Sequence, residues 1–187
     1  MIIQDSNALR QVSKPVTIEE VTGLTNRLEM ELSRSNNGIG LSAIQIGIPK
    51  RVSVIKSEDS FIHLINAEVI EKDEPFVFVG EGCLSMPGIY VDTKRYKQVS
   101  VSTDVVRGDK FDKETWEFYY DESNDLTPIA VQHEIDHFDG ILISDREVHD
   151  NKTKRRESQK VGRNSPCPCG KLKEDGSPVK YKKCCGS

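Results

Sequence analysis

The sequence predicts an α+β fold in which antiparallel β-sheets pack around a central helix that carries two histidines. Three observations lead to this prediction. Residues 132–137 read QHEIDH within a segment that has helical start and stop residues. Short β-like runs precede this segment, and their connections are too short for repeated βαβ crossovers, so antiparallel sheets are expected. An amphipathic helical pattern occurs near the start of the chain, and strands between two helices are typical of the α+β class.

The first helix is expected after an irregular stretch of sixteen residues. Thr17 and Glu20 have the spacing of a capping box. Apolar residues follow at helical spacing, which predicts an amphipathic helix that packs on the core: Val21, Leu24, Leu28 and Leu32. The sequence Asn-Asn-Gly at 36–38 is the expected end of this helix.

Residues 38–47 read GIGLSAIQIG, a loop of small residues. A dinucleotide-binding fingerprint fits poorly, because the third glycine is out of place and no strand precedes the loop. With Gln45 as its one amide side chain, the loop fits a site that grips backbone-like groups. A plain turn followed by an edge strand is an equally open interpretation.

The middle of the chain contains five β-like runs, which are Val52–Lys56, Phe61–Ile65, Phe76–Val79, Val99–Thr103 and Trp116–Tyr120. Cys83 lies in a glycine-flanked loop at a strand end. A lone cysteine is more often a small buried apolar residue than a ligand, and that alternative applies to Cys83.

The second helix is expected over Leu126–Phe138, with Thr127 as N-cap, Pro128 in the first helical position and Gly140 at the stop. His133 and His137 are four residues apart and therefore share one face. Two such imidazoles can bind one metal ion while Glu134 acts as a general base, although a surface helix with two chance histidines would look the same. A Cys83 thiolate would complete a three-ligand site and leave the fourth position to water.

Composition argues against several classes of protein. No run of about 18 apolar residues is present, so a transmembrane helix is not expected. The first residues lack a basic region followed by an apolar core, so a secretory signal is not expected either. Four of the five cysteines fall in the last 21 residues, which indicates metal or thiol chemistry in a reducing compartment and not a disulfide framework. We therefore expect a cytoplasmic protein.

Charge is unevenly divided along the chain. Residues 1–148 hold 15 Lys and Arg against 26 Asp and Glu, a net charge of −11, and residues 149–187 hold 11 against 4, a net charge of +7. A basic tail on an acidic body suggests an anionic partner such as RNA, although a solvated run of charges is an open alternative.

Three segments together resemble the signature motifs of the peptide deformylase family. They are GIGLSAIQ at 38–45, EGCLS at 81–85 and QHEIDH at 132–137, in that order, within a similarity that covers about residues 5–147. Ser42 stands where the family usually has Ala, and Phe138 where it usually has Leu. The resemblance implies a metal-dependent hydrolase of linear amides that removes the formyl group from the N-terminal formyl-methionine of newly made proteins.

The resemblance also implies roles for individual residues. Cys83, His133 and His137 would hold the metal, with Fe(II) as the active ion and Zn, Ni or Co as other occupants. Glu134 would move the proton, and Gln45 and the backbone N–H of Leu84 would stabilise the oxyanion. Substrate contacts would come from a further set of residues: Ile39, Gly40, Gly82, Val79, Leu126, Ile129 and Ala130.

The tail resembles the SEC-C type of zinc-binding motif. Its cysteines come in two close pairs, a composition that suits a closed tetrahedral zinc site: Cys167, Cys169, Cys184 and Cys185. A redox-active or free-thiol tail is the alternative. The expected domains are a catalytic domain over 1–147, a linker over 148–161 and the zinc motif over 162–187, the last of which would dock to a ribosome or a protein partner.

Two other functions remain open from the sequence. A deformylase-like body without activity would act as a zinc adaptor through its tail, but every catalytic residue type that the motifs require is present. A general HExxH peptidase is less compatible with a cysteine as third ligand. The oligomeric state, the native metal and the sequence preference beyond formyl-methionine do not follow from the sequence.

Overall fold

The computed structural model describes residues 1–57, 60–122 and 125–148, together with Lys173, Ser177, Lys180 and Lys183. The four cysteines expected to bind zinc in the tail lie outside the described residues: Cys167, Cys169, Cys184 and Cys185. Residues Met1–Val148 form one compact unit.

The unit contains two three-stranded antiparallel sheets and few helices, which confirms the predicted α+β class. The helices are α1 (Ser6–Leu9), α2 (Ile18–Ser33), the 3₁₀ helix η1 (Ala43–Ile46), α3 (Thr127–Phe138) and α4 (Ile143–Arg146). One sheet has the order β1 (Gly40–Ser42), β2 (Val52–Ser57), β3 (Ser60–Ile65). The other has the order β4 (Glu68–Cys83), β5 (Met86–Arg107), β6 (Lys110–Tyr119).

The first sheet separates two apolar clusters, and strand β2 contributes to both. Val52 and Val54 join the cluster that contains the apolar face of α2. Ile55 belongs instead to the cluster that contains the buried side chains of α3. Because successive residues of a strand point to opposite faces, one short strand can hold α2 on one side and α3 on the other.

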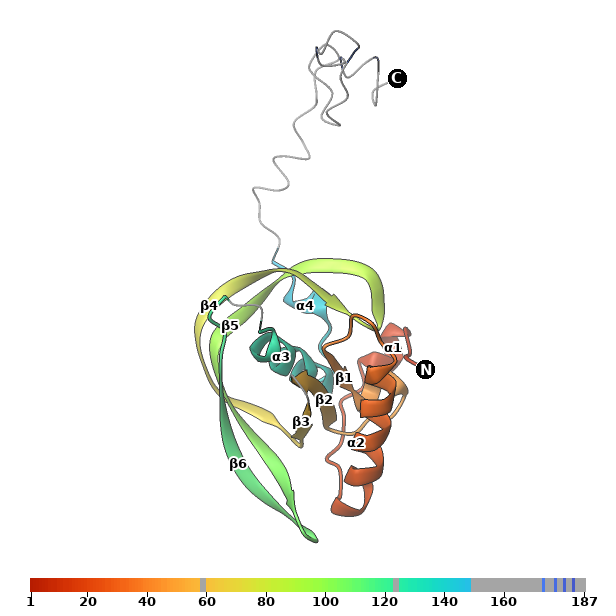
Figure 1. Ribbon diagram of the computed structural model, residues 1–187, viewed down its shortest axis with the longest axis vertical. Coiled ribbons are helices and arrows are strands. Elements are labelled where there is room, and N and C mark those ends of the chain that lie inside the picture. Colours follow the sequence, from red (N-terminus) through yellow and green to blue (C-terminus); the bar gives the residue numbers. More distant parts are fainter. Residues whose placement is uncertain are drawn as a thin grey trace. The chain divides into compact units, whose positions relative to one another are not determined.

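The second sheet is dominated by the long hairpin β4–β5, which curves around α3 (Figure 1). Val99 and Val101 of β5 pack into the same cluster as α3, so this helix contacts both sheets. The strands extend well beyond the predicted Phe76–Val79 and Val99–Thr103. The sequence criterion found only apolar runs, whereas the pairing of β4 with β5 continues through exposed polar residues.

Three further expectations about where the helices begin and end are wrong. Leu126, not Thr127, is the N-cap of α3, and the carboxylate of Asp125 accepts the Thr127 N–H at 2.9 Å. Helix α2 ends at Ser33, before the predicted stop, although Glu20 does accept the Thr17 N–H at 3.1 Å as a capping box requires. The first residues are not wholly irregular, because Asp5 caps the short helix α1.

No helix in the described part of the chain is long and apolar enough to cross a lipid bilayer.

Gly140 allows the chain to turn directly after α3. Its φ of 70° lies in the left-handed region, and a β-carbon there would lie 2.4 Å from the carbonyl oxygen of Arg10. We expect Gly140→Ala to lower the free energy of unfolding by about 2 kcal/mol or more, because backbone strain and the contact with Arg10 both oppose the added carbon. Urea denaturation measures the change.

Gly23→Ala is the matched control, because Gly23 lies inside α2 and, apart from its chain neighbours and the helix backbone, no atom of the described residues lies within 4 Å of its missing β-carbon. This substitution should raise the free energy of unfolding by about 0.5–1 kcal/mol. Equal effects at both glycines would contradict the assigned role of Gly140.

Candidate metal centre and active site

Cys83 and the two histidines reach one point from different parts of the chain. Cys83 is the last residue of β4 and pairs with Met86 across a two-residue turn. One ligand atom from each of Cys83, His133 and His137 lies within 4.8 Å of the others. The Cys83 Sγ and His137 Nε2 atoms are 3.4 Å apart, close to the separation of about 3.5 Å expected of a thiolate and an imidazole on one tetrahedral ion. The donor set therefore fits a divalent transition metal.

Glu81 fixes the orientation of the His133 ring. Its Oε1 atom lies 2.6 Å from His133 Nδ1, so Nε2 is the ring nitrogen that Glu81 does not engage. A carboxylate behind an imidazole in this way sets the tautomer of a metal-binding histidine and raises its basicity. On His137, the buried Nδ1 atom has no hydrogen-bond partner among the described residues, and the opposite nitrogen faces Cys83.

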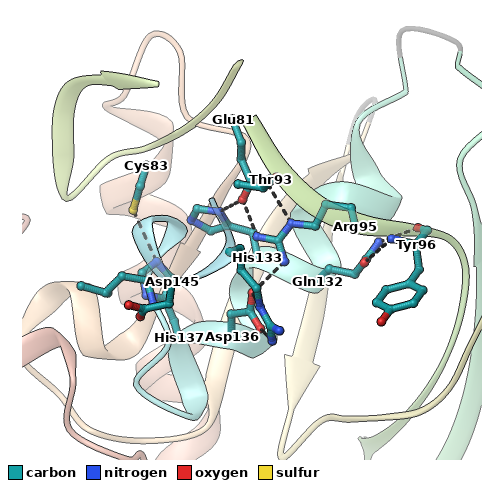
Figure 2. Close-up of polar contacts among 12 residues, drawn as sticks. Glu81, Cys83, Thr93, Arg95, Tyr96, Gln132, His133, Asp136, His137 and Asp145 are labelled. Carbon is teal, nitrogen blue, oxygen red and sulfur yellow. Dashed lines mark hydrogen bonds and ion pairs between the residues drawn. The ribbon is translucent and has the colours of Figure 1, made fainter. Parts of the chain in front are cut away.

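Glu81 is itself held by a chain of buried ion pairs, shown in Figure 2. Arg95 donates from Nε to Glu81 Oε2 at 2.7 Å and from Nη1 to Asp136 Oδ2 at 2.7 Å. Arg146, on α4, donates from Nη2 to Asp136 Oδ1 at 2.6 Å. Thr93 donates a further hydrogen bond to Glu81. The network joins β4, β5, α3 and α4 directly behind the candidate metal ligands.

Sequence reasoning assigned no role to this network. Glu81 and Asp136 lie within the motif segments, and both are at least 92% buried, yet neither was given a partner. Arg95 is 2% exposed. Two carboxylates within the motif segments require a positive charge nearby, and this requirement could have indicated the network. The sequence alone does not show that Arg95, and not another basic residue, supplies that charge.

The surroundings shift the pKa values of Glu81 and Glu134 in opposite directions. Burial alone would raise the pKa of Glu81, but hydrogen bonds with His133 and Arg95 outweigh burial and hold it well below its usual range. Glu134 is 2% exposed, and burial raises its pKa to about 7. A carboxyl group in this range can both accept and return a proton near neutral pH.

The two histidines also differ. Burial opposes the charged form of His133, yet hydrogen bonds with Cys83 and Glu81 raise its pKa well above the ordinary value. Burial, and then the charge on His133, push the pKa of His137 well below the ordinary value. One imidazole therefore favours the charged form and its neighbour the neutral form, as expected of two close groups that share one buried site.

Gln45 is held with its amide nitrogen toward the cysteine. Its Oε1 accepts the Ser42 N–H at 2.8 Å, and its Nε2 lies 3.5 Å from Cys83 Sγ and 3.2 Å from Ser85 Oγ. The unusual hydroxyl of Ser42 accepts a hydrogen bond from Ser53 at 2.9 Å. Phe138, the other unusual residue, is fully buried, with the Arg51 guanidinium 5.1 Å from its ring centroid. Both departures are therefore accommodated by direct contacts.

Glu134 lies against the backbone of β1. A β-carbon on Gly40 would be 2.4 Å from Glu134 Oε1, so only glycine leaves space for the carboxylate in this position. The other oxygen, Oε2, is buried and has no hydrogen-bond partner among the described residues. An unpartnered buried carboxylate oxygen beside a cavity is suited to bind a water molecule or a substrate proton.

A cavity of about 460 Å³ opens in front of these groups. Five of the predicted catalytic and metal residues border it: Gln45, Cys83, Leu84, His133 and Glu134. Six of the predicted substrate contacts border it as well: Ile39, Gly40, Gly82, Leu126, Ile129 and Ala130. Val79 does not, and it is 73% exposed. Phe78 borders the cavity in its place, which the motif spacing does not predict.

Comparison with known proteins gives consistent matches. The family model described as polypeptide deformylase matches residues 1–154. The peptide deformylase of Acetivibrio thermocellus is 36% identical over 158 residues, which cover 81% of this chain and 87% of the relative. The peptide deformylase of Heliobacterium modesticaldum is 38% identical over 144 residues, covering 76% and 89%. The crystal structure of peptide deformylase from Thermotoga maritima is similar with a TM-score of 0.69 at 32% identity, covering 79% of this chain and 97% of that chain.

The buried ion network generates a stability prediction. Arg95→Lys keeps the positive charge but loses the planar fork that reaches Glu81 and Asp136 together. We expect the free energy of unfolding to fall by about 2 kcal/mol, because one of the two buried carboxylates loses its hydrogen bonds with Arg95. Arg107→Lys is the control, since Arg107 makes an exposed pair with Glu114 and should have little effect. Comparable losses in both variants would show that the buried network is not special.

Proposed function

The chain belongs to the polypeptide deformylase family, and we propose that Cys83, His133 and His137 hold the metal ion on which this family depends. The chain is a hydrolase that removes the formyl group from the formylated N-termini of newly synthesised proteins. The observation that supports these three ligands most directly is the convergence of a thiol and two imidazoles beside a buried carboxylate at the cavity.

We propose Fe(II) as the active ion, with Zn, Ni or Co as alternative occupants. A thiolate and two imidazoles are acceptable ligands for all four ions, and the choice of iron rests on the family resemblance. A bound divalent ion supplies Lewis acidity, which makes water a stronger acid and polarises a carbonyl group. The carboxylate of Glu81 supports the ligand set by holding His133 Nδ1, so that Nε2 is the nitrogen that would bind an ion.

Glu134 is the proposed proton carrier. It accepts the proton of the attacking water and returns it to the amine that leaves when the formyl C–N bond breaks. Its burial at 2% exposure favours this role, as does its Oε2 atom, which has no hydrogen-bond partner among the described residues. A metal ion held by Cys83, His133 and His137 would place a positive charge near Glu134. This charge would favour the ionised form of the Glu134 carboxylate, which is the form that accepts the proton.

Gln45 and Leu84 are the proposed donors to the oxyanion that develops on the formyl oxygen. The Gln45 amide cannot turn freely, because its oxygen is engaged by the Ser42 N–H. Its NH₂ group is consequently directed toward Cys83, at the edge of the cavity where Leu84 also lies. Donors fixed before the reaction need no reorganisation as negative charge develops.

The peptide is proposed to bind as an added strand. Strands β1 and β4 each lie at the edge of their sheet, so Ile39, Gly40 and Gly82 offer backbone groups beside the cavity. The methionine side chain would contact the apolar residues of α3 and its N-cap, which are Leu126, Ile129 and Ala130.

The tail is proposed to bind zinc through its four cysteines, all of which lie outside the described residues: Cys167, Cys169, Cys184 and Cys185. So small a segment has too few apolar residues to fold without a metal. Its net charge of +7 from 149 to 187 favours an anionic partner, such as ribosomal RNA or an acidic protein, in the cytoplasm.

Glu134→Gln tests the role of the carboxylate. The variant should keep its bound metal and lose at least about 100-fold in kcat on formyl-Met-Ala-Ser, because an amide cannot carry the proton. Formate release and metal analysis of the same sample measure both quantities. Glu68→Gln, at an exposed position of β4, is the control and should be fully active. A Glu134→Gln variant with near-normal turnover would refute the assignment.

Metal content tests the two proposed sites separately. The full chain should bind about two metal ions, Cys83→Ser about one, and a chain cut after Lys160 about one, by counting ligands in the two sites. The truncated chain should retain kcat/KM on formyl-Met-Ala-Ser within about twofold, because the body holds every proposed catalytic residue. An unchanged metal content in Cys83→Ser would mean that Cys83 is only a buried thiol.

A further inference from the structure

We propose that Phe78, and not its neighbour Val79, forms the wall that limits the size of the first side chain of the substrate. This inference rests on the proposed deformylase function and adds a specificity residue to it. Phe78 borders the cavity with Leu126 and Ala130, whereas Val79 is 73% exposed.

The placement follows from an irregularity in the β4–β5 pairing. Phe78 is opposite Thr93, but Glu81 is opposite Val91, so β4 advances three residues while β5 advances two. The extra residue is a β-bulge, in which Gly80 has a φ of 74° and donates its N–H to Asp92 at 3.0 Å.

The bulge reverses the alternation of side chains along β4. Counting back by twos from Cys83 through Glu81 would place Val79 on the cavity side. One inserted residue moves Phe78 to that side and leaves Val79 on the outer face. The exposures agree, since Phe76 and Phe78 are half-buried while Val77 and Val79 are exposed.

An aromatic cluster holds the Phe78 ring in place. The Tyr120 ring meets Phe78 edge-on, with centroids 5.9 Å apart, and stacks on Phe76 at 5.2 Å. Tyr120 is anchored in turn, because its N–H donates to the Lys97 carbonyl at 2.8 Å. A ring packed on Tyr120, which itself stacks on Phe76, moves less than a lone valine at a strand edge, so the wall is rigid.

A rigid aromatic wall fits a long unbranched side chain such as methionine, whose thioether makes favourable contacts with aromatic rings. The same wall would exclude a bulkier first residue. Removal of the ring should therefore enlarge the site and shift the preference toward larger side chains, by a factor comparable to other single-group differences in apolar pockets.

The test compares kcat/KM for formyl-Met-Ala-Ser and formyl-Phe-Ala-Ser in the metal-loaded full-length protein. Phe78→Ala should shift the ratio of the two values by about tenfold or more in favour of formyl-Phe-Ala-Ser. Phe78→Leu, a smaller change that preserves an apolar core contact, should shift it in the same direction and keeps the test valid if Phe78→Ala does not fold. Val79→Ala is the matched control and should leave the ratio within about twofold.

The outcomes separate this inference from the function on which it rests. A wild-type protein without activity on formyl-Met-Ala-Ser would refute the proposed function. An active wild type whose ratio is unchanged in both Phe78 variants would overturn the inference and leave the function intact. A shift in Val79→Ala equal to that in Phe78→Ala would also overturn it, because the bulge would then not decide which residue meets the substrate.

Discussion

One buried guanidinium holds the two halves of the site in position. Arg95 of β5 binds Glu81 at the end of β4 and Asp136 on α3, so it joins the hairpin that carries Cys83 to the helix that carries the histidines. Neither carboxylate is well hydrated, since both are at least 92% buried. Each charge is therefore stable only while its partners are in place. The convergence of ligand candidates from β4 and α3 follows from this requirement.

The same network explains why the short helix α4 matters for the site. Arg146 binds both oxygens of Asp136, so that two guanidinium groups balance two carboxylates. Buried ion pairs contribute less to stability than well-packed apolar residues of similar volume. Their hydrogen bonds are, however, short and directional. We interpret the network as a device that selects one relative arrangement of hairpin and helix, with Glu81 transmitting that arrangement to the His133 ring.

The features that the sequence predicted are local, and those that it missed are not. The shared face of His133 and His137 follows from the helical repeat alone. Arg95 forms ion pairs with carboxylates that are 14 and 41 residues away in the sequence. No local pattern indicates which basic residue forms these pairs. The side of β4 on which Phe78 lies depends on a bulge that exists only in the pairing with β5. The length of β4 and β5 was underestimated for the same reason, because pairing sustains strands whose exposed residues are polar.

Gly40 shows how an inactive relative of this chain would differ. A β-carbon at residue 40 would lie 2.4 Å from Glu134 Oε1, so the carboxylate would have to turn away while every proposed ligand and donor stayed present. Among natural variants, a chain with alanine at this position would still carry all the residues of the other two segments, 81–85 and 132–137. The identity of residue 40 would therefore distinguish enzymes from binding proteins among such chains better than the presence of the two histidines would.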